Sequence, residues 1–467
     1  MFERVLSRFW QQKDEVGGLK NLVFHTALAL TLTSGLSYFL GLIRDRTFAR
    51  TFGAGADLDV YNAAFVVPDF FLAFFVTSGL AAAFVPIFTG LDERGRGKAV
   101  EYTNQVLSYA LVILVGLSLV FAVALPSFAD FLVPGFDEVA KAEYVKVTRL
   151  MLLSPLLFTV SNTFGDVLIS IKEFFWYGLA PAMYNIGIII GVFVFVPHFG
   201  VMGLVMGTIL GAALHLSIRI PSVLRYGFRF RLNFKMDENL KETVKLMAPK
   251  MFQIGMWQIL LWWFIRLASQ LPEGSITIYS FARNFQSVPV SLIGIAIALS
   301  AFASLSHIAA KGNYKEFKRL IWRKSGVIVG YTALAAVALG GISFWLIDFL
   351  LGGGKFDHAA VQATAALLIV YCVSVPLESV MHLLARAHYA LKNTLRPSGI
   401  HIFTIILTMI VSAALLPKVG LYAIPISFAG GLAVQILLLI LSLRQLIKIK
   451  EKRGSITSKL KSFFGRF

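Results

Sequence analysis

The chain has 467 residues, of which 57% are hydrophobic and only 15% are charged, and its formal net charge is +18. Because soluble domains carry about 25% charged residues, this composition excludes a water-soluble protein. It also removes nucleic acid as the expected partner of the positive charge, which basic loops beside membrane-spanning helices explain more simply. The single cysteine, Cys372, excludes a disulfide framework.

Long stretches without Asp, Glu, Lys or Arg define the fold class. They cover residues 22–43, 70–91, 102–129, 174–217, 284–306, 325–347, 397–417 and 419–443. A helix needs about 20 apolar residues to cross a hydrocarbon layer of about 30 Å. Because lipid offers no hydrogen-bond partners to the backbone, each crossing must be helical. The sequence therefore predicts an all-α polytopic membrane protein.

We expect about twelve transmembrane helices in two pseudo-symmetric six-helix lobes. In chain order the predicted helices cover 22–44, 60–90, 102–129, 147–171, 174–197, 200–224, 246–271, 279–309, 325–349, 360–389, 397–417 and 419–444. The predicted parts are a cytoplasmic N-terminal segment (1–21), an N-lobe (22–224), a basic cytoplasmic linker (225–245), a C-lobe (246–445) and a basic cytoplasmic tail (446–467).

An internal repeat supports the two lobes. The segment Pro197-His-Phe-Gly200 ends one apolar helix and begins the next, and Pro417-Lys-Val-Gly420 does the same 220 residues later. Pro181 and Pro397 lie near the start of the preceding helix in each copy. Internal repeats are how many transporters build a central site between two halves.

The basic residues predict an orientation. They gather in 1–21, 94–98, 225–245, 311–324 and 446–467, and twelve crossings place all five groups on one side. That side is expected to be the cytoplasm, with both termini there. The tail also carries Leu460, Phe463, Phe464 and Phe467 among its cations. It fits an amphipathic segment on the membrane surface and a solvated basic tail equally well.

The first candidate site is a group of charges at the end of the first helix. Arg44, Asp45, Arg46 and Arg50 lie there, on the side opposite to the other basic groups. One interpretation is an ordinary helix end, with an Arg44–Asp45 pair. The other is an anion site, because guanidinium groups match phosphate oxygens in pairs. Asp59 follows at the start of the second helix.

Two further arginines begin the C-lobe. Arg266 follows Trp262 and Trp263, and the sequence favours an anchor at the helix end over a binding role. Arg283, followed by Asn284, lies on a helix that is otherwise apolar to Ser306, and fits a cavity site and a structural role about equally.

Other charges lie inside apolar segments. Asp166 is interpreted as part of a charge network with Lys172 and Glu173 at a cytoplasmic helix end. Glu378, His382 and Arg386 are spaced by four, so they share one helix face. Such a stripe fits a coupling-ion or proton site, or a structural interlock between helices, and the interlock is slightly favoured.

Prolines in these spans predict kinks or breaks. They are Pro68, Pro155, Pro181, Pro289, Pro376 and Pro425, whereas Pro249 lies in a first helical turn, where proline is tolerated. No Walker loop, metal-binding cluster, paired-aspartate motif or nucleophile elbow is found in the sequence. We therefore expect neither an enzyme nor a cofactor, although a coupling ion of unassigned identity fits a transporter.

Seven segments of the chain are informative when taken together in order: "GLIRDRTFARTFGAGADLDVYNAAFVVPDF", "SGLAAAFVPIF", "VPGF", "GDVLISIKEFFWYGLAPAMYNIGIII", "NFQSVPVSLIGIAIA", "GGKF" and "LARAHYALKNTLRP". In these segments and in their order, the sequence resembles the MurJ/MviN family of lipid II flippases, within the wider superfamily of multidrug and polysaccharide exporters. The resemblance covers nearly the whole chain.

The resemblance implies an inner-membrane flippase for undecaprenyl-pyrophosphate-linked peptidoglycan precursor, working by alternating access around a cationic cavity. By position, Arg44 matches the family's cavity arginine on the first helix, flanked by Gly41 and Asp45, and Asp59 and Pro68 match positions on the second. The implied partners are the lipid-linked glycan, membrane lipids and cell-wall synthesis proteins.

This chain also departs from the family pattern. Tyr38 and Leu72 stand where many members have arginine, and Thr77 stands where many have glutamate. Arg283 precedes by one residue the usual arginine of helix eight, whose place Asn284 takes, and one residue turns a helical side chain by about 100°. Many members have fourteen helices rather than twelve.

The sequence therefore predicts that Arg44, with Arg283, Arg50, Asp59 and Asn284, binds the pyrophosphate, and that Gly41, Asp45, Pro68, Arg266 and Glu378 support them. We expect the lobes to rock and an ion gradient or the membrane potential to drive the cycle. Two alternatives stay open: a flippase for another polyprenyl-linked glycan, and a transport-inactive scaffold for cell-wall synthesis.

Overall fold

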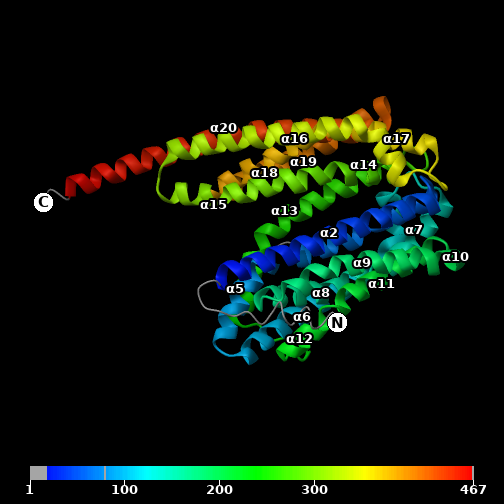
Figure 1. Cartoon of the computed structure of the whole chain (residues 1–467), viewed down its shortest axis with the longest axis horizontal. Helices are drawn as coiled ribbons and strands as arrows, with labels where there is room; N and C mark the ends of the chain where they lie inside the picture. Colours follow the sequence, from blue (N-terminus) through cyan, green and yellow to red (C-terminus); the bar gives the residue numbers. More distant parts are fainter. Residues whose placement is uncertain (1–17, 78–79, 465–467) are drawn as a thin grey trace. The chain divides into compact units, whose positions relative to one another are not determined.

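A computed structural model describes residues 18–77 and 80–464 (Figure 1). These residues form helices joined by short connections, and no β-strand occurs among them. Most of the segment 1–21 and the last residues of the tail lie outside the described part of the chain, as do the side chains of 452–464. The proposed amphipathic face of the tail is therefore not described.

The helices follow one another in this order. They are α2 (Gly18–Phe52), α3 (Ala56–Ala64), α4 (Val66–Leu72), the π-helix η1 (Ala73–Thr77), α5 (Leu80–Glu93), α6 (Arg96–Leu132), α7 (Glu138–Met151), α8 (Leu153–Ser170), α9 (Phe174–Val194), α10 (Val196–Phe199), α11 (Val201–Ser217), α12 (Ile220–Tyr226), α13 (Glu238–Ala268), α14 (Ser275–Pro289), the π-helix η2 (Val290–Ile295), α15 (Ala296–Ala310), α16 (Tyr314–Leu351), α17 (His358–Cys372), α18 (Ser374–Ala390), α19 (Leu395–Val419), the 3₁₀ turn η3 (Gly420–Tyr422) and α20 (Ala423–Phe464).

The all-α membrane fold is confirmed. Within the described residues, eight helical stretches are long and apolar enough to cross a membrane, and the bent pair α17–α18 makes a ninth. The longest stretch, Leu395–Glu451, contains both α19 and α20, and Ile254–Ala268 of α13 is a shorter apolar helix. The crossings are consistent with the predicted architecture, and the count of twelve stays a prediction.

The described chain separates into two compact units. Unit 1 comprises residues up to Thr47, Val67–Pro126 and Val145–Phe252, and unit 2 comprises Phe48–Val66, Ser127–Tyr144 and residues from Gln253 onward. In unit 1, α9 packs along α11, and α8 contacts both. In unit 2, α20 packs against α18 and α19, and α16 packs against α17 and α18. The predicted lobe boundaries at 22–224 and 246–445 stay predictions.

The backbone supports the internal repeat. Gly200 and Gly420 adopt the same unusual conformation, with φ of 55° and 57° and ψ of −136° at both. Lys172 and Lys392, also 220 residues apart, are the two non-glycine residues with positive φ in the described chain. Because positive φ is uncommon outside glycine, the same exception at the same place in each copy indicates a common backbone design.

Prolines break the helices in a regular way. The helical run is interrupted at Phe65, Leu152 and Val373, and in each case a proline (Pro68, Pro155 or Pro376) follows three residues later. A proline has no N–H and its ring clashes with the carbonyl one turn before it, so the preceding turn opens. The last of these breaks bends α17 against α18 by 41°. Pro181 instead lies inside the continuous helix α9.

Two helices begin before the apolar spans predicted for them, because hydropathy marks the hydrocarbon-crossing part of a helix rather than its ends. The helix predicted at 147–171 is preceded by the polar first part of α7, which begins at Glu138. The helix predicted at 246–271 begins within the predicted linker, at Glu238 of α13. Charged residues have adequate helix propensity, so a helix continues beyond its apolar stretch into water.

The non-helical part of the linker is attached to α6. The side chain of Asn104 bonds the backbone at Arg229 and Arg231, with N–O distances of 3.0 Å to each. One turn later, the backbone N–H of Asn233 donates to Ser108 Oγ at 2.9 Å. Buried polar side chains of α6 thus satisfy the backbone of an extended segment, which fixes its path.

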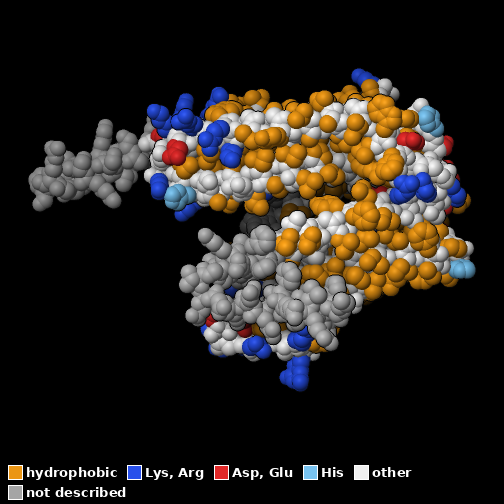
Figure 2. All heavy atoms as spheres, in the orientation of Figure 1, with side chains coloured by type: hydrophobic (Ala, Val, Ile, Leu, Met, Phe, Trp, Pro, Cys, Tyr) orange, Lys and Arg blue, Asp and Glu red, His pale blue; other side chains and the backbone are white. Residues whose placement is uncertain are grey.

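The surface has the character expected of a membrane protein. On the face shown in Figure 2, hydrophobic side chains cover the length of α16, and Lys and Arg gather where α15 ends and α16 begins. Exposed apolar residues of α16 include Leu334, Val337, Trp345 and Phe349. Such a continuous exposed apolar surface is explained by contact with lipid.

Candidate functional site

Arg44 is held in unit 1 between α2 and α9. Its guanidinium donates to Asp45 Oδ1 from Nε (3.0 Å) and Nη2 (2.8 Å), and to Asn185 Oδ1 from Nη1 (3.0 Å). The Asn185 amide is itself oriented by the carbonyl oxygens of Ser37 and Pro181. Gly41, one turn before Arg44, also faces Asn185, and a Cβ there would lie 3.9 Å from the Asn185 Nδ2. The arginine is therefore fixed in one direction, and 24% of its side chain remains exposed.

The predicted Arg44–Asp45 pair is thus present, with Asn185 as a further partner that the sequence did not indicate. Asn185 lies inside an apolar helix, 141 residues from Arg44. A polar side chain buried among apolar residues was the available signal. The pairing orients the guanidinium and also offsets part of its charge, and the anion site stays a prediction.

A polar cavity of about 630 Å³ lies within unit 1 beside this cluster. Its lining is drawn from α2, α8, α9 and α11, with Arg219 just beyond α11: Leu30, Ser34, Ser37, Tyr38, Asn162, Asp166, Tyr177, Gly178, Pro181, His215 and Arg219. Ser37 connects the two features, because it lines the cavity and its carbonyl oxygen accepts from the Asn185 amide.

Arg219 is the main charge of the cavity wall. Only 3% of the residue is exposed. Its Nη1 donates to the carbonyl oxygen of Ser161 and its Nη2 to that of Tyr177 at 3.3 Å, while its Nε has no partner among the described residues. Gly165 permits this position, because a Cβ there would lie 2.7 Å from Arg219 Nη1.

Asp166 belongs to this cavity and not to the predicted end-of-helix network. It is buried, lines the cavity and interacts electrostatically with Arg219. His215, on the same wall, bonds Ser161 Oγ through Nδ1 at 2.7 Å. The sequence missed this site because Asp166 was interpreted with its chain neighbours, whereas Arg219, which lines the same cavity, comes from just beyond the end of α11.

Arg283 forms a closed network in unit 2. Its Nη1 and Nη2 donate to the two carboxylate oxygens of Glu378 at 3.1 and 3.0 Å. Gln286 donates to Glu378 Oε2 (3.0 Å) and Ser374 Oγ (2.9 Å), and its own Oε1 accepts from Arg283. The rings of Trp257 and Phe428 lie beside the guanidinium, at 5.9 and 5.1 Å from its carbon. The network joins α14 to α18.

This network bears on the two interpretations of Glu378. The carboxylate is 7% exposed and pairs in a bidentate manner with Arg283, not with its face neighbours His382 and Arg386. Arg386 instead donates to the backbone oxygen of His382. The geometry is that of an interlock between two helices. A coupling-ion role for Glu378 stays a prediction.

Asn284 and Arg266 do not join Arg283. Asn284 is exposed, on a different side of α14 from Arg283, as a turn of about 100° per residue requires. Arg266 donates to the carbonyl oxygen of Phe131, and its guanidinium lies over the rings of Phe131 (5.0 Å) and Trp263 (6.0 Å). This is the aromatic anchor that the sequence favoured for Arg266.

Arg50 and Asp59 connect segments of unit 2. Arg50 Nε donates to the Gly352 oxygen at 3.3 Å, and the Arg50 carbonyl oxygen accepts from Lys355 N at 3.0 Å. Gly53, at φ of 72°, packs against this turn, where a Cβ would lie 2.5 Å from the Lys355 oxygen.

Asp59 is buried, and its carboxylate accepts from the backbone N–H groups of Gly274 and Thr277 and from the Thr277 hydroxyl, at 2.6–2.8 Å. These bonds give Arg50 and Asp59 structural contacts within unit 2, and their predicted substrate contact stays a prediction.

A family model described as "Lipid II flippase MurJ" matches residues 48–465 of the chain. The chain belongs to the lipid II flippase MurJ family. The match includes Arg283 and Glu378 and begins after Arg44 and Asp45, so it does not bear on those two residues.

Similar proteins agree with this membership. A protein from Thermotoga maritima described as a probable lipid II flippase MurJ is 28% identical over 374 residues, which is 79% of this chain and 75% of that protein. A lipid II flippase MurJ from Burkholderia cenocepacia is 26% identical over 442 residues, 91% of this chain and 84% of that protein.

Solved structures show the same fold. A lipid II flippase MurJ in an inward closed conformation has a TM-score of 0.78 at 20% identity, over 94% of this chain and 93% of that one. An inward-facing multidrug resistance MATE family transporter of the MOP superfamily has a TM-score of 0.75 at 14% identity, over 91% and 99%. The MurJ-family chain is therefore a multi-span membrane protein with the fold of this transporter superfamily.

Proposed function

We propose that this chain translocates lipid II from the inner to the outer leaflet of the bacterial cytoplasmic membrane by alternating access. The observation that carries the proposal is the family match over residues 48–465. Two features of the site are consistent with it: a pre-oriented guanidinium on α2, and a polar cavity beside it within unit 1.

Arg44 is the residue we assign to the diphosphate. A diphosphate carries oxygens that fit the fork of a guanidinium, and a fixed donor loses less conformational entropy on binding than a free one. Asp45 and Asn185 fix the group while a quarter of the side chain stays exposed. Arg283 is the second residue that we assign to the diphosphate. To bind it, the guanidinium has to leave the Glu378 carboxylate and pair with phosphate oxygens instead.

The proposal includes a topology. The basic segments 225–245 and 311–324 face the cytoplasm, as do both termini, because short cytoplasmic loops are enriched in Lys and Arg. Single cysteines introduced into each loop of a Cys372→Ala chain test this with a membrane-impermeant thiol reagent on intact cells. Labelling of the 311–324 connection from outside would contradict the orientation.

The deciding experiment uses proteoliposomes that contain only this protein. Lipid II and an undecaprenyl diphosphate that carries a different glycan are incorporated, and their arrival in the outer leaflet is followed with an added enzyme that modifies only exposed headgroups. Faster arrival of lipid II than in protein-free vesicles is expected. Arrival of the other glycan alone would favour a different flippase. Movement of neither substrate, by a folded protein, would favour the scaffold.

The energy source is measured in the same vesicles. An imposed potential acts on each charge moved across the membrane with about 2.3 kcal/mol per 100 mV. We expect the rate to change with the sign of the potential, because the diphosphate is anionic. Exchange of sodium for potassium, at fixed potential and pH, tests for a coupling cation.

A further inference from the structure

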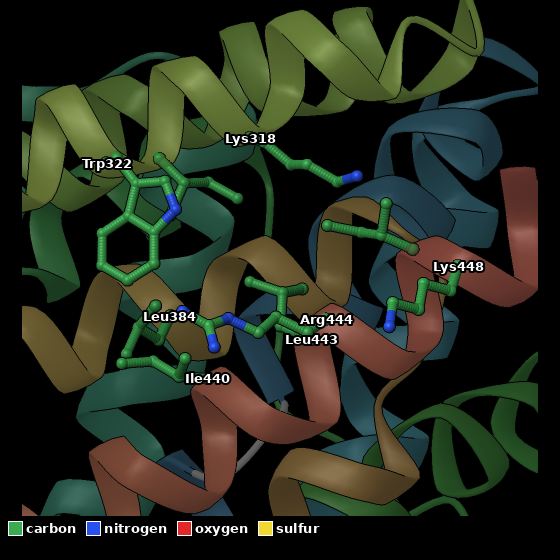
Figure 3. A pocket seen from close by; sticks show the side chains of 9 residues that line it. Lys318, Trp322, Leu384, Ile440, Leu443, Arg444 and Lys448 are labelled. Carbon is green, nitrogen blue, oxygen red and sulfur yellow. The ribbon is translucent and has the colours of Figure 1, made fainter.

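A groove with an apolar floor and a basic rim lies in unit 2, where α16, α18 and α20 meet (Figure 3). Its volume is about 260 Å³. The lining residues are Lys318, Ile321 and Trp322 of α16, Leu384 of α18, and Ile440, Leu443, Arg444, Ile447 and Lys448 of α20. None of the roles discussed above uses this groove.

Helical spacing places the cations on the groove. Arg444 and Lys448 are four residues apart, so they lie on one face of α20, and Lys318 and Trp322 have the same spacing on α16. Figure 3 shows Lys318 on the α16 side of the groove and Arg444 and Lys448 on the α20 side. Ile321, Leu384, Leu443 and Ile447 form the buried floor between them.

The rim has an excess of positive charge. Lys318 pairs with Glu451 at 2.8 Å, but the two side chains are 44% and 41% exposed, and exposed pairs contribute little. Among the described residues, no carboxylate lies within ion-pair distance of Arg444 or Lys448. Three cations therefore face one carboxylate.

The groove also lies at a suitable depth. Its cations are near the start of α16 and beyond the apolar part of α20, both of which belong to candidate membrane spans. Trp322 is half exposed, and tryptophan is enriched where lipid headgroups meet the hydrocarbon. Towards the apolar part of α20, Leu437 and Leu441 are exposed and continue the hydrophobic surface.

We propose that this groove binds an anionic phospholipid, with the phosphate between Lys318, Arg444 and Lys448 and an acyl chain along the apolar floor. Basic pockets at the cytoplasmic ends of spans are where acidic lipid headgroups bind. A free phosphate ion would leave the floor uncovered. The apolar floor offers a glycopeptide headgroup no hydrogen-bond partners, and the groove of about 260 Å³ would take the phosphate and the nearest part of the chain.

The test titrates the full-length purified chain with phosphatidylglycerol in detergent and follows its thermal unfolding, with bound lipids counted by native mass spectrometry. Phosphatidylcholine with the same acyl chains and inorganic phosphate are the comparison ligands. We expect phosphatidylglycerol alone to raise the Tm. An equal rise with phosphatidylcholine or with phosphate would overturn the proposal, because the site requires both the charge and the chain.

Two matched triple variants test whether phosphatidylglycerol binds in the groove itself. The K318Q/R444Q/K448Q chain should bind phosphatidylglycerol about hundredfold more weakly and lose the Tm rise, since each basic side chain near a membrane surface contributes to lipid attraction. The K311Q/K315Q/R319Q chain removes the same charge from the end of the α15–α16 connection and the first turns of α16, at residues that do not line the groove, and should bind normally. Equal losses in both chains would show non-specific attraction and refute the site.

Two further variants separate the parts of the groove. Glu451→Gln releases Lys318 from its carboxylate and should tighten binding of phosphatidylglycerol. Trp322→Ala should weaken binding of long-chain phosphatidylglycerol more than binding of a short-chain form, because it removes apolar surface from the groove wall. A groove occupied by a second copy of the chain would instead give a dimer that these substitutions dissolve, which mass spectrometry would detect. Lipid II transport is not measured, so the result is independent of the flippase proposal.

Discussion

Unit 1 and unit 2 share a backbone design but differ in what their polar interiors contain. In unit 1, Arg219 and Asp166 line an open cavity of about 630 Å³, and Arg219 Nε has no partner among the described residues. In unit 2, Arg283 and Glu378 are enclosed in a network with Gln286. Turns and proline breaks thus repeat between the units, whereas the buried charges line a cavity in unit 1 and form an ion pair between α14 and α18 in unit 2.

Residues 220 apart make the difference specific. Asp166 of the cavity corresponds in the sequence repeat to Arg386, and His215 corresponds to Gln435, which bonds His401 at 3.1 Å. The repeat thus places the acidic Asp166 of unit 1 at the position of the basic Arg386 of unit 2. Since the backbone of the repeat does not depend on these side chains, each unit is free to carry its own chemistry.

The free energy of unfolding should fall most when the Arg283–Glu378 ion pair of unit 2 is broken. Glu378→Gln leaves Arg283 buried without its carboxylate and should lower the free energy of unfolding by about 3–5 kcal/mol. Asp166→Asn should cost less, because water can enter the polar cavity and Arg219 keeps two carbonyl acceptors. Denaturant unfolding in detergent measures both. A larger loss for Asp166→Asn would reverse the comparison of the two units.

A double substitution separates the pair from its surroundings. Arg283→Gln with Glu378→Gln removes both charges, so it should recover much of the stability lost in Glu378→Gln alone. If the double variant is no more stable than the single one, the destabilisation comes from the other bonds of Gln286 and Ser374 and not from an unpaired charge.

The next effect concerns transport. Arg44→Ala should slow lipid II translocation about ten- to hundredfold, since a hydrogen bond to a charged group contributes about 1.5–3 kcal/mol. Its Tm should fall as well, because Asp45 and Asn185 lose a hydrogen-bond donor, so the two rates are compared at a temperature at which the variant is folded. Arg94→Ala, which removes an exposed loop arginine, is the matched control. Full activity of the Arg44→Ala chain in proteoliposomes would remove Arg44 from the substrate site.

A smaller effect is expected at the helix contact of unit 1. Gly191 and Gly207 let α9 and α11 touch, and a Cβ on Gly191 would lie 2.3 Å from the Cα of Gly207. Gly191→Ala should therefore destabilise unit 1 by about 1–3 kcal/mol. Gly430→Ala on α20 of unit 2 has open space and should be nearly neutral. Similar unfolding midpoints for the two variants would argue against this close contact.

The smallest effect distinguishes two adjacent tryptophans of unit 2. Trp263 Nε1 donates to the Met409 oxygen (3.1 Å) and to Ser412 Oγ (3.0 Å). Trp262 Nε1 is buried without a partner among the described residues. Trp263→Phe should cost about 1 kcal/mol more than Trp262→Phe, because only the first loses hydrogen bonds. Equal changes in Tm would show that packing, and not bonding, accounts for both.

Much of the fold could be predicted from particular residues. The charge-free stretches identified the apolar helices, and Pro68, Pro155 and Pro376 each predicted a break that the structure places three residues earlier. The starts of α7 and α13 could not be predicted, because their first turns are polar and resemble loops in hydropathy. The site was predicted less well: Arg44 and Arg283 were identified, but not their partner Asn185, nor Arg219.

The helical, membrane-spanning character of the chain can be read from its sequence, because it depends on the apolar length of each segment and is local. The repeat is readable as well, since glycine permits positive φ and proline removes a backbone donor at particular positions. Whether a buried charge such as Asp59 or Glu378 has a partner is visible only in the folded chain. That pairing joins residues up to 218 positions apart, and no local pattern encodes which helix faces which.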